Sequence, residues 1–250
     1  MCSLNWHKFP EHIGIAFNRD ESVKRSKAHP PSIFTECDVS YLMPIDPDGN
    51  GSWIAVNEFG FAVMLLNDYQ GQLKHQSADL VSRGQLVKRV AVSRNWAEVE
   101  RTVNAWSLSK SQPFQLVVMH INSEPMLWHY DGIKQKVEPQ QLSTGLYSSG
   151  HPAVVDILAA RHRYMAQQRV EQDADLIEIH RSHVPENNMP LDAVDKRAHA
   201  FCMHRPEACT QSLSYIKLGR SEVSFEYWPG QPCETDQVIT QTLPLIAESF

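Results

Sequence analysis

Hydrophobic and polar positions divide the chain into strand-like segments near both ends and helix-like segments between them. Short apolar or alternating runs bounded by Gly, Pro, Asn or Asp predict β-strands. The predicted strands cover residues 2–7, 13–17, 53–56, 61–66, 114–121, 125–130, 140–147, 199–204, 211–218 and 222–228. Residues 22–51 are rich in Pro, Asp, Ser and Gly, and they are predicted to form mainly a loop, long enough to be functional.

Helical spacing follows the first group of strands. Apolar residues recur at three- and four-residue intervals within residues 96–108, which is typical of an amphipathic helix, and Asn95 can cap its first turn. The predicted helices cover residues 83–92, 96–108, 152–169 and 172–182. Because no linker or internal repeat divides the chain, the pattern predicts one α+β domain over residues 1–250, with helices packed against sheets.

Composition narrows the class of protein. The chain has 250 residues, 42% of them hydrophobic, which is enough for a substantial core. Its 23 Lys+Arg and 29 Asp+Glu give a formal net charge of −6 without a basic stripe, so no nucleic acid partner is expected.

The longest uninterrupted apolar run, residues 61–66, is too short for a membrane span, and residues 1–12 lack the apolar core of a signal peptide. Five widely spaced cysteines without a CxxC pair fit reduced thiols, so a cytoplasmic location is expected.

The first candidate for chemistry is the Met-Cys start of the chain. The initiator methionine is normally removed before a residue as small as cysteine, so Cys2 is expected to carry both a thiol and a free α-amine. The amine titrates at about 7.7–8.0 and the thiol at about 8.5, so the amine can take the thiol proton near neutral pH. One residue then supplies nucleophile and base. The alternative is a chance Met-Cys start, which many proteins have.

Two polar features follow buried strands. The tetrapeptide Asn-Arg-Asp-Glu at residues 18–21 ends the second predicted strand; if that strand pairs with the first, Arg19 lowers the thiol pKa of Cys2 and a carboxylate orients its amine. Asn67 ends a later apolar strand, so its amide is a candidate oxyanion donor, worth about 2.7–4 kcal/mol of transition-state stabilisation. The alternatives are a solvated turn with a local ion pair at residues 18–21 and a turn that merely starts at Asn67.

Taken together, these stretches resemble the NRDE family, the relatives of transport and Golgi organisation protein 2, within the N-terminal nucleophile (Ntn) hydrolase superfamily. Residues 56–67 are also similar to choloylglycine hydrolases and penicillin V acylases, in which a Val-Asn-Glu-x-Gly turn leads to the oxyanion-hole residue. The resemblance covers residues 1–90 and continues more weakly to residue 227. It rests on five motifs in order: Met-Cys at residues 1–2, Asn-Arg-Asp-Glu at 18–21, Gly-Ser-Trp-Ile-Ala-Val-Asn at 51–57, Leu-Leu-Asn at 65–67 and Ser-Arg-Gly at 82–84.

The resemblance implies a four-layer αββα sandwich with Cys2 on an inner strand. It assigns Arg19 and Asp20 to support of the nucleophile and Asn67 to the oxyanion hole. Two departures stand out. Residues 148–150 contain no Asn, where the hydrolase pattern has a second one, and Gln211 stands near the position of an expected late arginine. A neutral amide cannot supply charge to a developing oxyanion.

The sequence therefore leaves two alternative functions. The first is an amidohydrolase that cleaves a non-peptide C–N bond of a small acylated substrate, with Cys2 as the nucleophile. The alternative is a non-catalytic carrier or trafficking protein that holds a hydrophobic ligand, such as haem or an acyl-CoA, in the same cleft. The sequence leaves the ligand, the oligomeric state and the removal of Met1 open.

The sequence matches known calcium and haem motifs only in part. Residues 46–51 match the start of an EF-hand loop, but its twelfth position is Asn57 rather than Glu. Cys233 follows Pro232 and could contact haem, yet no CxxCH attachment site occurs.

A group of four soft donors lies near the end of the chain: His199, Cys202, His204 and Cys209. On a strand His199 would face away from Cys202 and His204, so one ion could not readily collect all four. The sequence therefore predicts no metal and no cofactor.

Overall fold

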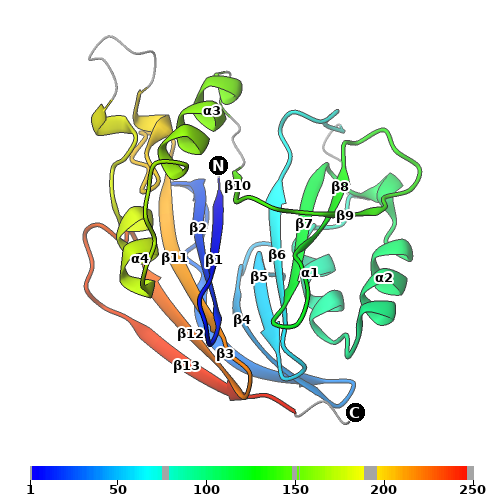
Figure 1. Cartoon of the computed structure of the whole chain (residues 1–250). Coiled ribbons are helices and arrows are strands. Elements are labelled where there is room, and N and C mark those ends of the chain that lie inside the picture. The colour runs from blue at the N-terminus through cyan, green and yellow to red at the C-terminus, as the bar shows by residue number, and fades with distance from the viewer. Residues whose placement is uncertain (1, 75–78, 148–150, 152, 189–195, 247–250) are drawn as a thin grey trace.

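Two antiparallel sheets form the centre of the computed structural model, which describes residues 2–74, 79–147, 151, 153–188 and 196–246 (Figure 1). The first sheet has six strands in the order β10-β1-β2-β11-β12-β13. It pairs the start of the chain with its far end, because β11 lies against β2. Its strands are β1 (Ser3–Lys8), β2 (Ile13–Ser22), β10 (Leu146–Tyr147), β11 (Ala208–Leu218), β12 (Glu222–Pro229) and β13 (Ile239–Pro244).

The second sheet is a meander of seven strands in sequence order. Each strand pairs with the next one along the chain, so short connections are enough to build it. Its strands are β3 (His29–Glu36), β4 (Val39–Ile45), β5 (Ile54–Asn57), β6 (Phe61–Asn67), β7 (Phe114–His120), β8 (Met126–Tyr130) and β9 (Pro139–Gln141).

Helices cover the outer faces of both sheets, which gives four layers (Figure 1). The layer between the sheets is a shared apolar core, to which Phe17 contributes from one sheet and Met64 from the other. On the outer face of the seven-stranded sheet lie α1 (Gly84–Ala91) and α2 (Trp96–Asn104). On the other side, α4 (Asp173–Arg181) packs on the six-stranded sheet, and α3 (Val154–Met165) packs on the segment before β11. Short 3-10 turns occupy Leu108–Lys110, Glu186–Asn188 and Lys196–His199.

This arrangement confirms the predicted αββα sandwich. Strand β2 shows the reason in its pattern: every residue from Ile13 to Asp20 is buried, because one face meets the other sheet and the opposite face meets helices. A strand covered on both faces reads as a continuous run rather than as an alternating one. Among the described residues, no helix is both long and apolar enough to cross a membrane.

The predicted loop over residues 22–51 is wrong for much of its length. It contains the end of β2 and the hairpin of β3 and β4, joined by Cys37 and Asp38, whose φ values of 53° and 57° suit a tight hairpin turn. Strand β3 lies at the edge of its sheet, where prolines are tolerated because no neighbour needs their missing N–H. The prolines and polar residues that signalled a loop therefore mark an edge strand.

The predicted strand at residues 199–204 is also wrong. A 3-10 turn ends at His199, and His204 forms only an isolated bridge with Cys209. The cause is Arg161, whose buried guanidinium binds the carbonyl oxygens of three successive residues, 198–200. Successive carbonyls of a strand point to opposite edges and could not converge in this way.

Two smaller differences concern strand ends. The predicted strand at residues 140–147 is split between β9, in the seven-stranded sheet, and β10, in the six-stranded sheet. Strand β13 pairs with β12 at the sheet edge and was not predicted.

Candidate active site

The start of β1 and the end of β2 bring the first candidate residues together. In the β1–β2 pair, Ser3 lies opposite Asn18, so the residues after Asn18 lie beside Cys2. The Sγ atom of Cys2 is 3.8 Å from the backbone carbonyl oxygen of Asp20. Antiparallel pairing thus brings the tetrapeptide at residues 18–21 to the candidate nucleophile.

A cavity of about 110 Å³ opens beside Cys2. Its wall contains three of the four predicted site residues, Cys2, Arg19 and Asn67. The fourth, Asp20, is buried and meets Cys2 through its backbone carbonyl. The complete wall consists of Cys2, Arg19, Glu21, Arg25, Asp46, Gly51, Ser52, Trp53, Leu65, Asn67, Ser82, Arg83 and Gly84.

The carboxyl group of Asp20 lies in the interior. Its Oδ1 atom accepts a hydrogen bond of 2.6 Å from the Thr210 hydroxyl. Burial raises the pKa of Asp20 to about 6, although the charge of Arg161 and the Thr210 hydrogen bond act to lower it. Asp20 is therefore a carboxyl group whose ionisation depends on pH in the range where enzymes commonly work.

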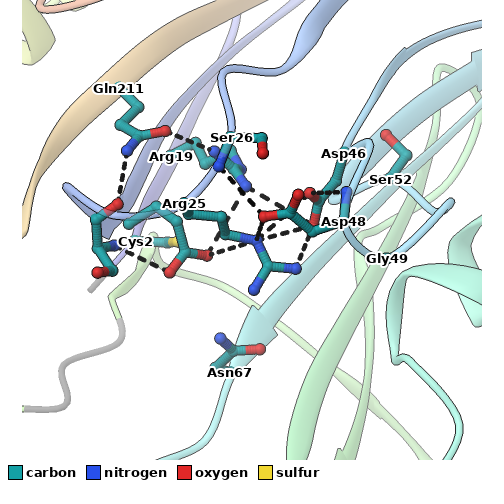
Figure 2. A network of polar contacts seen from close by, with 12 residues as sticks. Cys2, Arg19, Arg25, Ser26, Asp46, Asp48, Gly49, Ser52, Asn67 and Gln211 are labelled. Atoms are coloured by element: carbon teal, nitrogen blue, oxygen red, sulfur yellow. Dashed lines mark hydrogen bonds and ion pairs between the residues drawn. The ribbon is translucent and has the colours of Figure 1, made fainter.

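Arg19 is held by contacts on several sides. Its Nη1 atom donates to Oε1 of Gln211 at 3.0 Å (Figure 2). Its guanidinium carbon lies 4.6 Å from the ring centre of Trp53. Gln211 in turn donates to the carbonyl of Ser22, and it sits where the β2–β11 register shifts between Thr210 and Ser212. Gln211 thus fixes the orientation of Arg19.

A second arginine is bound to the turn that resembles a calcium loop. Two nitrogen atoms of Arg25 contact the carboxylate of Asp46, the shorter contact being 2.5 Å (Figure 2). Asp48 accepts a hydrogen bond from the backbone N–H of Ser26. The carboxylates of this turn therefore bind an arginine and the backbone.

Asn67 is at the end of β6, where a tight turn begins. Its Nδ2 atom donates to the hydroxyl oxygen of Tyr69 at 3.0 Å. Asp68 closes the turn by accepting from the N–H groups of Gln70 and Gly71, an Asx-type arrangement. In Figure 2 the Asn67 side chain stands apart from the network of arginines and carboxylates. Asn67 is thus in the cavity wall, next to the turn, with its amide bound to Tyr69.

Sequence reasoning missed Arg83 and Tyr69 as site residues. Arg83 lines the cavity and donates from Nη1 to the carbonyl of Pro113 at 2.7 Å. Burial lowers the pKa of Arg83, while Tyr69 and Cys2 act in the opposite direction, so both lie within its electrostatic reach. The Ser-Arg-Gly motif at residues 82–84 could have indicated Arg83, because it was one of the motifs of the family resemblance, but no function was assigned to it.

A close backbone contact positions Arg83. The N–H of Ser52 donates to the carbonyl of Gly84 at 3.2 Å. A Cβ atom on Gly51 would lie 2.5 Å from the carbonyl carbon of Gly84, so only glycine allows the two chains to approach this closely. The Gly-Ser-Trp and Ser-Arg-Gly motifs therefore contact each other through their backbones. This contact holds the start of α1, and the arginine before it, at the cavity.

The charges around Cys2 oppose one another. Burial raises the pKa of the Cys2 thiol, and the carboxylates of Asp20 and Glu21 raise it further. A cation beside a thiol favours the thiolate, so an arginine of the cavity wall would act in the opposite direction. Arg19 and Arg25 lie against carboxylates, whereas Arg83 donates to a neutral carbonyl. Arg83 shares the cavity wall with Cys2, and the two groups interact electrostatically, so Arg83 is a candidate to favour the thiolate.

Solved structures with the same arrangement of sheets are hydrolases of the Ntn class. A mutant conjugated bile acid hydrolase from Clostridium perfringens is 14% identical (TM-score 0.55; 96% of this chain, 92% of that chain). Penicillin V acylase from Agrobacterium tumefaciens is 13% identical (TM-score 0.56; 96% and 85%). An N-acylethanolamine-hydrolyzing acid amidase ortholog from Caenorhabditis elegans is 12% identical (TM-score 0.54; 98% and 100%).

The fold is thus that of the Ntn hydrolases. At such low identity the likeness defines the fold and leaves the activity open. The family model of Transport and Golgi organisation 2 matches residues 5–218, and the chain belongs to this family. No curated protein sequence matches the chain. The second asparagine of the hydrolase pattern would fall at residues 148–150, which lie outside the described residues.

Proposed function

We propose that the protein is an Ntn-type cysteine amidohydrolase, which cleaves a non-peptide C–N bond of a small acylated substrate. The observation that carries this proposal is the shared cavity of Cys2, Arg19 and Asn67 at the paired ends of β1 and β2. The proposal requires that Met1 is removed, so that Cys2 has a free α-amine. The conjugated bile acid hydrolase, the penicillin V acylase and the acid amidase support it, since each is named for such a hydrolysis.

In the proposed reaction the α-amine of Cys2 takes the thiol proton, and the thiolate attacks the amide carbonyl carbon. A C–S bond forms, and the oxyanion receives hydrogen bonds from Asn67 and a backbone N–H. The C–N bond then breaks, and the leaving amine takes the proton from the α-ammonium group. Water attacks the thioester, its proton passes to the α-amine, and the C–S bond breaks to release a carboxylic acid.

Three charged residues support this reaction. The carboxylate of Asp20 orients the α-ammonium group and acts as a positioning residue above a pH of about 6, where it is ionised. Arg83 stabilises the thiolate through its charge. Arg19, fixed by Gln211, shapes the wall beside Cys2.

The test is a comparison of Cys2→Ala with the parent protein on a conjugated bile acid, penicillin V and an N-acylethanolamine. The parent protein is expected to hydrolyse at least one of these amides and to form a transient acyl-enzyme at Cys2, seen by intact mass. Cys2→Ala is expected to lose at least ~1,000-fold in kcat/KM, because the nucleophile is gone.

The matched control is Cys37→Ala, which changes an exposed cysteine far from the cavity wall. It should leave both rate and acylation unchanged. Full hydrolysis by Cys2→Ala would refute the proposal, as would a parent protein that retains Met1 in every molecule of an active sample.

The carrier hypothesis requires a cavity large enough to hold most of a hydrophobic ligand. Drug-sized ligands occupy pockets of ~300–1,000 Å³, whereas the cavity beside Cys2 holds about 110 Å³. A scissile amide and its nearest atoms fit this space, whereas the rest of a substrate, like most of haem or of an acyl-CoA, would lie outside it. Saturable binding of either ligand to Cys2→Ala, without any acyl-enzyme in the parent protein, would favour the carrier instead.

Further expectations accompany the proposal. Residues 1–250 act as one domain, in keeping with the single core between the sheets. The partner is a small molecule rather than nucleic acid, consistent with the net charge of −6. All five cysteines are free, which suits a reducing cytoplasm.

A further inference from the structure

A second group of sulfur and nitrogen donors lies away from the Cys2 cavity. It consists of His183, Cys202, His204 and Cys233, here called the Cys–His cluster. The Nε2 atom of His204 is 3.1 Å from Sγ of Cys233 and 3.6 Å from Sγ of Cys202. A ligand atom of His183 lies within 4.8 Å of those of His204 and Cys233, and the two imidazole rings are 4.8 Å apart.

Three segments of the chain form this cluster, and backbone hydrogen bonds join two of them. The N–H of Phe201 donates to the carbonyl of Val184, and the N–H of Cys202 donates to the carbonyl of Ser182, both at 2.9 Å. These bonds place His183 beside the irregular segment that replaces the predicted strand. The cluster is therefore a product of tertiary pairing.

Arg181 at the end of α4 brings the third segment to the cluster. Its Nε atom donates to the carbonyl of Pro232 at 2.9 Å, and its Nη2 atom contacts Asp236. Both acceptors lie in the connection between β12 and β13, which runs beside α4 in Figure 1. Cys233 is thereby held next to His204.

The spacing of the donors matches a tetrahedral zinc ion. Bonds of ~2.3 Å to sulfur and ~2.0–2.1 Å to nitrogen place a ligand sulfur and a ligand nitrogen about 3.6 Å apart. The Cys202–His204 distance of 3.6 Å matches this separation, and the Cys233–His204 distance of 3.1 Å is somewhat shorter. Two cysteines and two histidines are a donor set that structural zinc sites commonly use. An ordinary network of surface histidines would not collect two thiols around one imidazole.

We propose that the Cys–His cluster binds one zinc ion, through the thiolates of Cys202 and Cys233 and the imidazoles of His183 and His204. Each thiol gives its proton to the solvent on binding, so one ion releases two protons. The ion joins α4, the segment before β11 and the β12–β13 connection. This site is separate from the proposed hydrolase reaction, and its test does not depend on activity.

The experiment titrates the reduced, metal-free protein with Co²⁺, followed by Zn²⁺. The visible and near-ultraviolet spectrum is expected to develop the bands of tetrahedral, thiolate-bound cobalt, to saturate at one equivalent, and to disappear when zinc displaces the cobalt. Zinc at a hundredfold excess over its Kd is expected to raise the melting temperature by ~5–10 °C.

Cys233→Ser tests the ligand assignment, since Cys233 is only partly buried and its replacement should preserve the fold. Loss of a supporting partner of a metal ligand typically costs 10–100-fold in affinity, so loss of the ligand itself should cost at least ~100-fold. The matched controls are Cys209→Ser, a nearby cysteine outside the cluster, and Cys2→Ala. Both should bind cobalt as the parent protein does.

Two results would overturn the proposal. The first is a reduced protein without a saturable cobalt spectrum. The second is a Cys233→Ser variant that melts like the metal-free parent yet keeps the parent spectrum and affinity. His183→Gln, which alters a different segment, repeats the test should Cys233→Ser fail to fold.

Discussion

The Cys2 cavity and the Cys–His cluster both contain cysteines, but their surroundings suit different chemistry. Cys2 immediately precedes a regular strand and lines a cavity with three arginines. Cys202 is buried in an irregular segment, next to imidazole. A cation beside a thiol favours a reactive thiolate, whereas neutral nitrogen donors and a second thiol favour a shared metal ion. The partners of a cysteine, more than the cysteine, determine its role.

The two sites are physically connected through the interior. Thr210 donates from its hydroxyl to Asp20 and accepts at the same oxygen from the N–H of Met203. Met203 lies between two members of the Cys–His cluster, Cys202 and His204. A change that loosens the segment at residues 198–204 should therefore disturb both regions.

The largest expected effect comes from Arg161→Met. Arg161 is fully buried, and it binds Ser3 next to Cys2 as well as the carbonyls of residues 198–200. Its loss leaves buried acceptors without their donor, so the free energy of unfolding should fall by about 3–5 kcal/mol. Urea denaturation measures this. Arg163→Met, on the exposed face of the same helix, is the control and should change stability by less than ~0.5 kcal/mol. An equal loss of unfolding free energy in the two variants would contradict the structural role assigned to the buried contacts of Arg161.

A smaller effect concerns the pH dependence of stability. The folded pKa of Asp20 is raised from 3.8 to about 6, so the folded state binds more protons than the unfolded state between these values. Stability contributed by this group is therefore lost as pH rises from about 4 to 6, by at most about 3 kcal/mol. Urea denaturation at several pH values should show this loss in the parent and not in Asp20→Asn. The same slope in both proteins would mean that Asp20 is not the group responsible.

The smallest expected effect concerns the reactivity of the Cys2 thiol, which compares Arg83 with Arg25. Arg83→Met should slow alkylation of Cys2 by iodoacetamide at pH 7 severalfold, because a cation that favours the thiolate is lost from the cavity wall. Arg25→Met should slow it less, since Asp46 already neutralises that arginine. Mass spectrometry of the alkylated N-terminal peptide gives both rates, and Arg83→Lys is expected to retain most of the parent rate. A larger effect at Arg25 would reverse the assignment.

Local sequence patterns were informative where a residue and its partners lie on adjacent regular strands. Cys2 and the tetrapeptide at residues 18–21 are joined by a single hairpin pairing, β1 with β2, which alternation and turn residues predict. Asn67 was selected because an apolar run ends there, and the structure places it in the cavity wall, while its role as an oxyanion donor stays a prediction. The αββα layers followed from the resemblance carried by these same motifs.

The edge strand β3 and the segment before β11 were mispredicted for physical reasons. An edge strand needs hydrogen bonds on one side only, so its prolines and polar residues give the signal of a loop. The segment at residues 198–204 has the apolar pattern of a strand, but Arg161, from a distant helix, gathers its carbonyls. Local pattern carries no information about a partner so far along the chain.

The sequence by itself determined the candidate nucleophile and the family, because these depend on contiguous motifs, whereas the pairing of the first two strands was only a condition that the structure met. Tertiary structure alone decided that Gln211 holds Arg19, and that Arg83 lines the same cavity as Cys2. It also decided that Cys233 and His183 replace Cys209 and His199 around Cys202 and His204. Each of these contacts joins segments brought together by packing of the sheets and helices. Their distance and orientation therefore exist only in the folded chain.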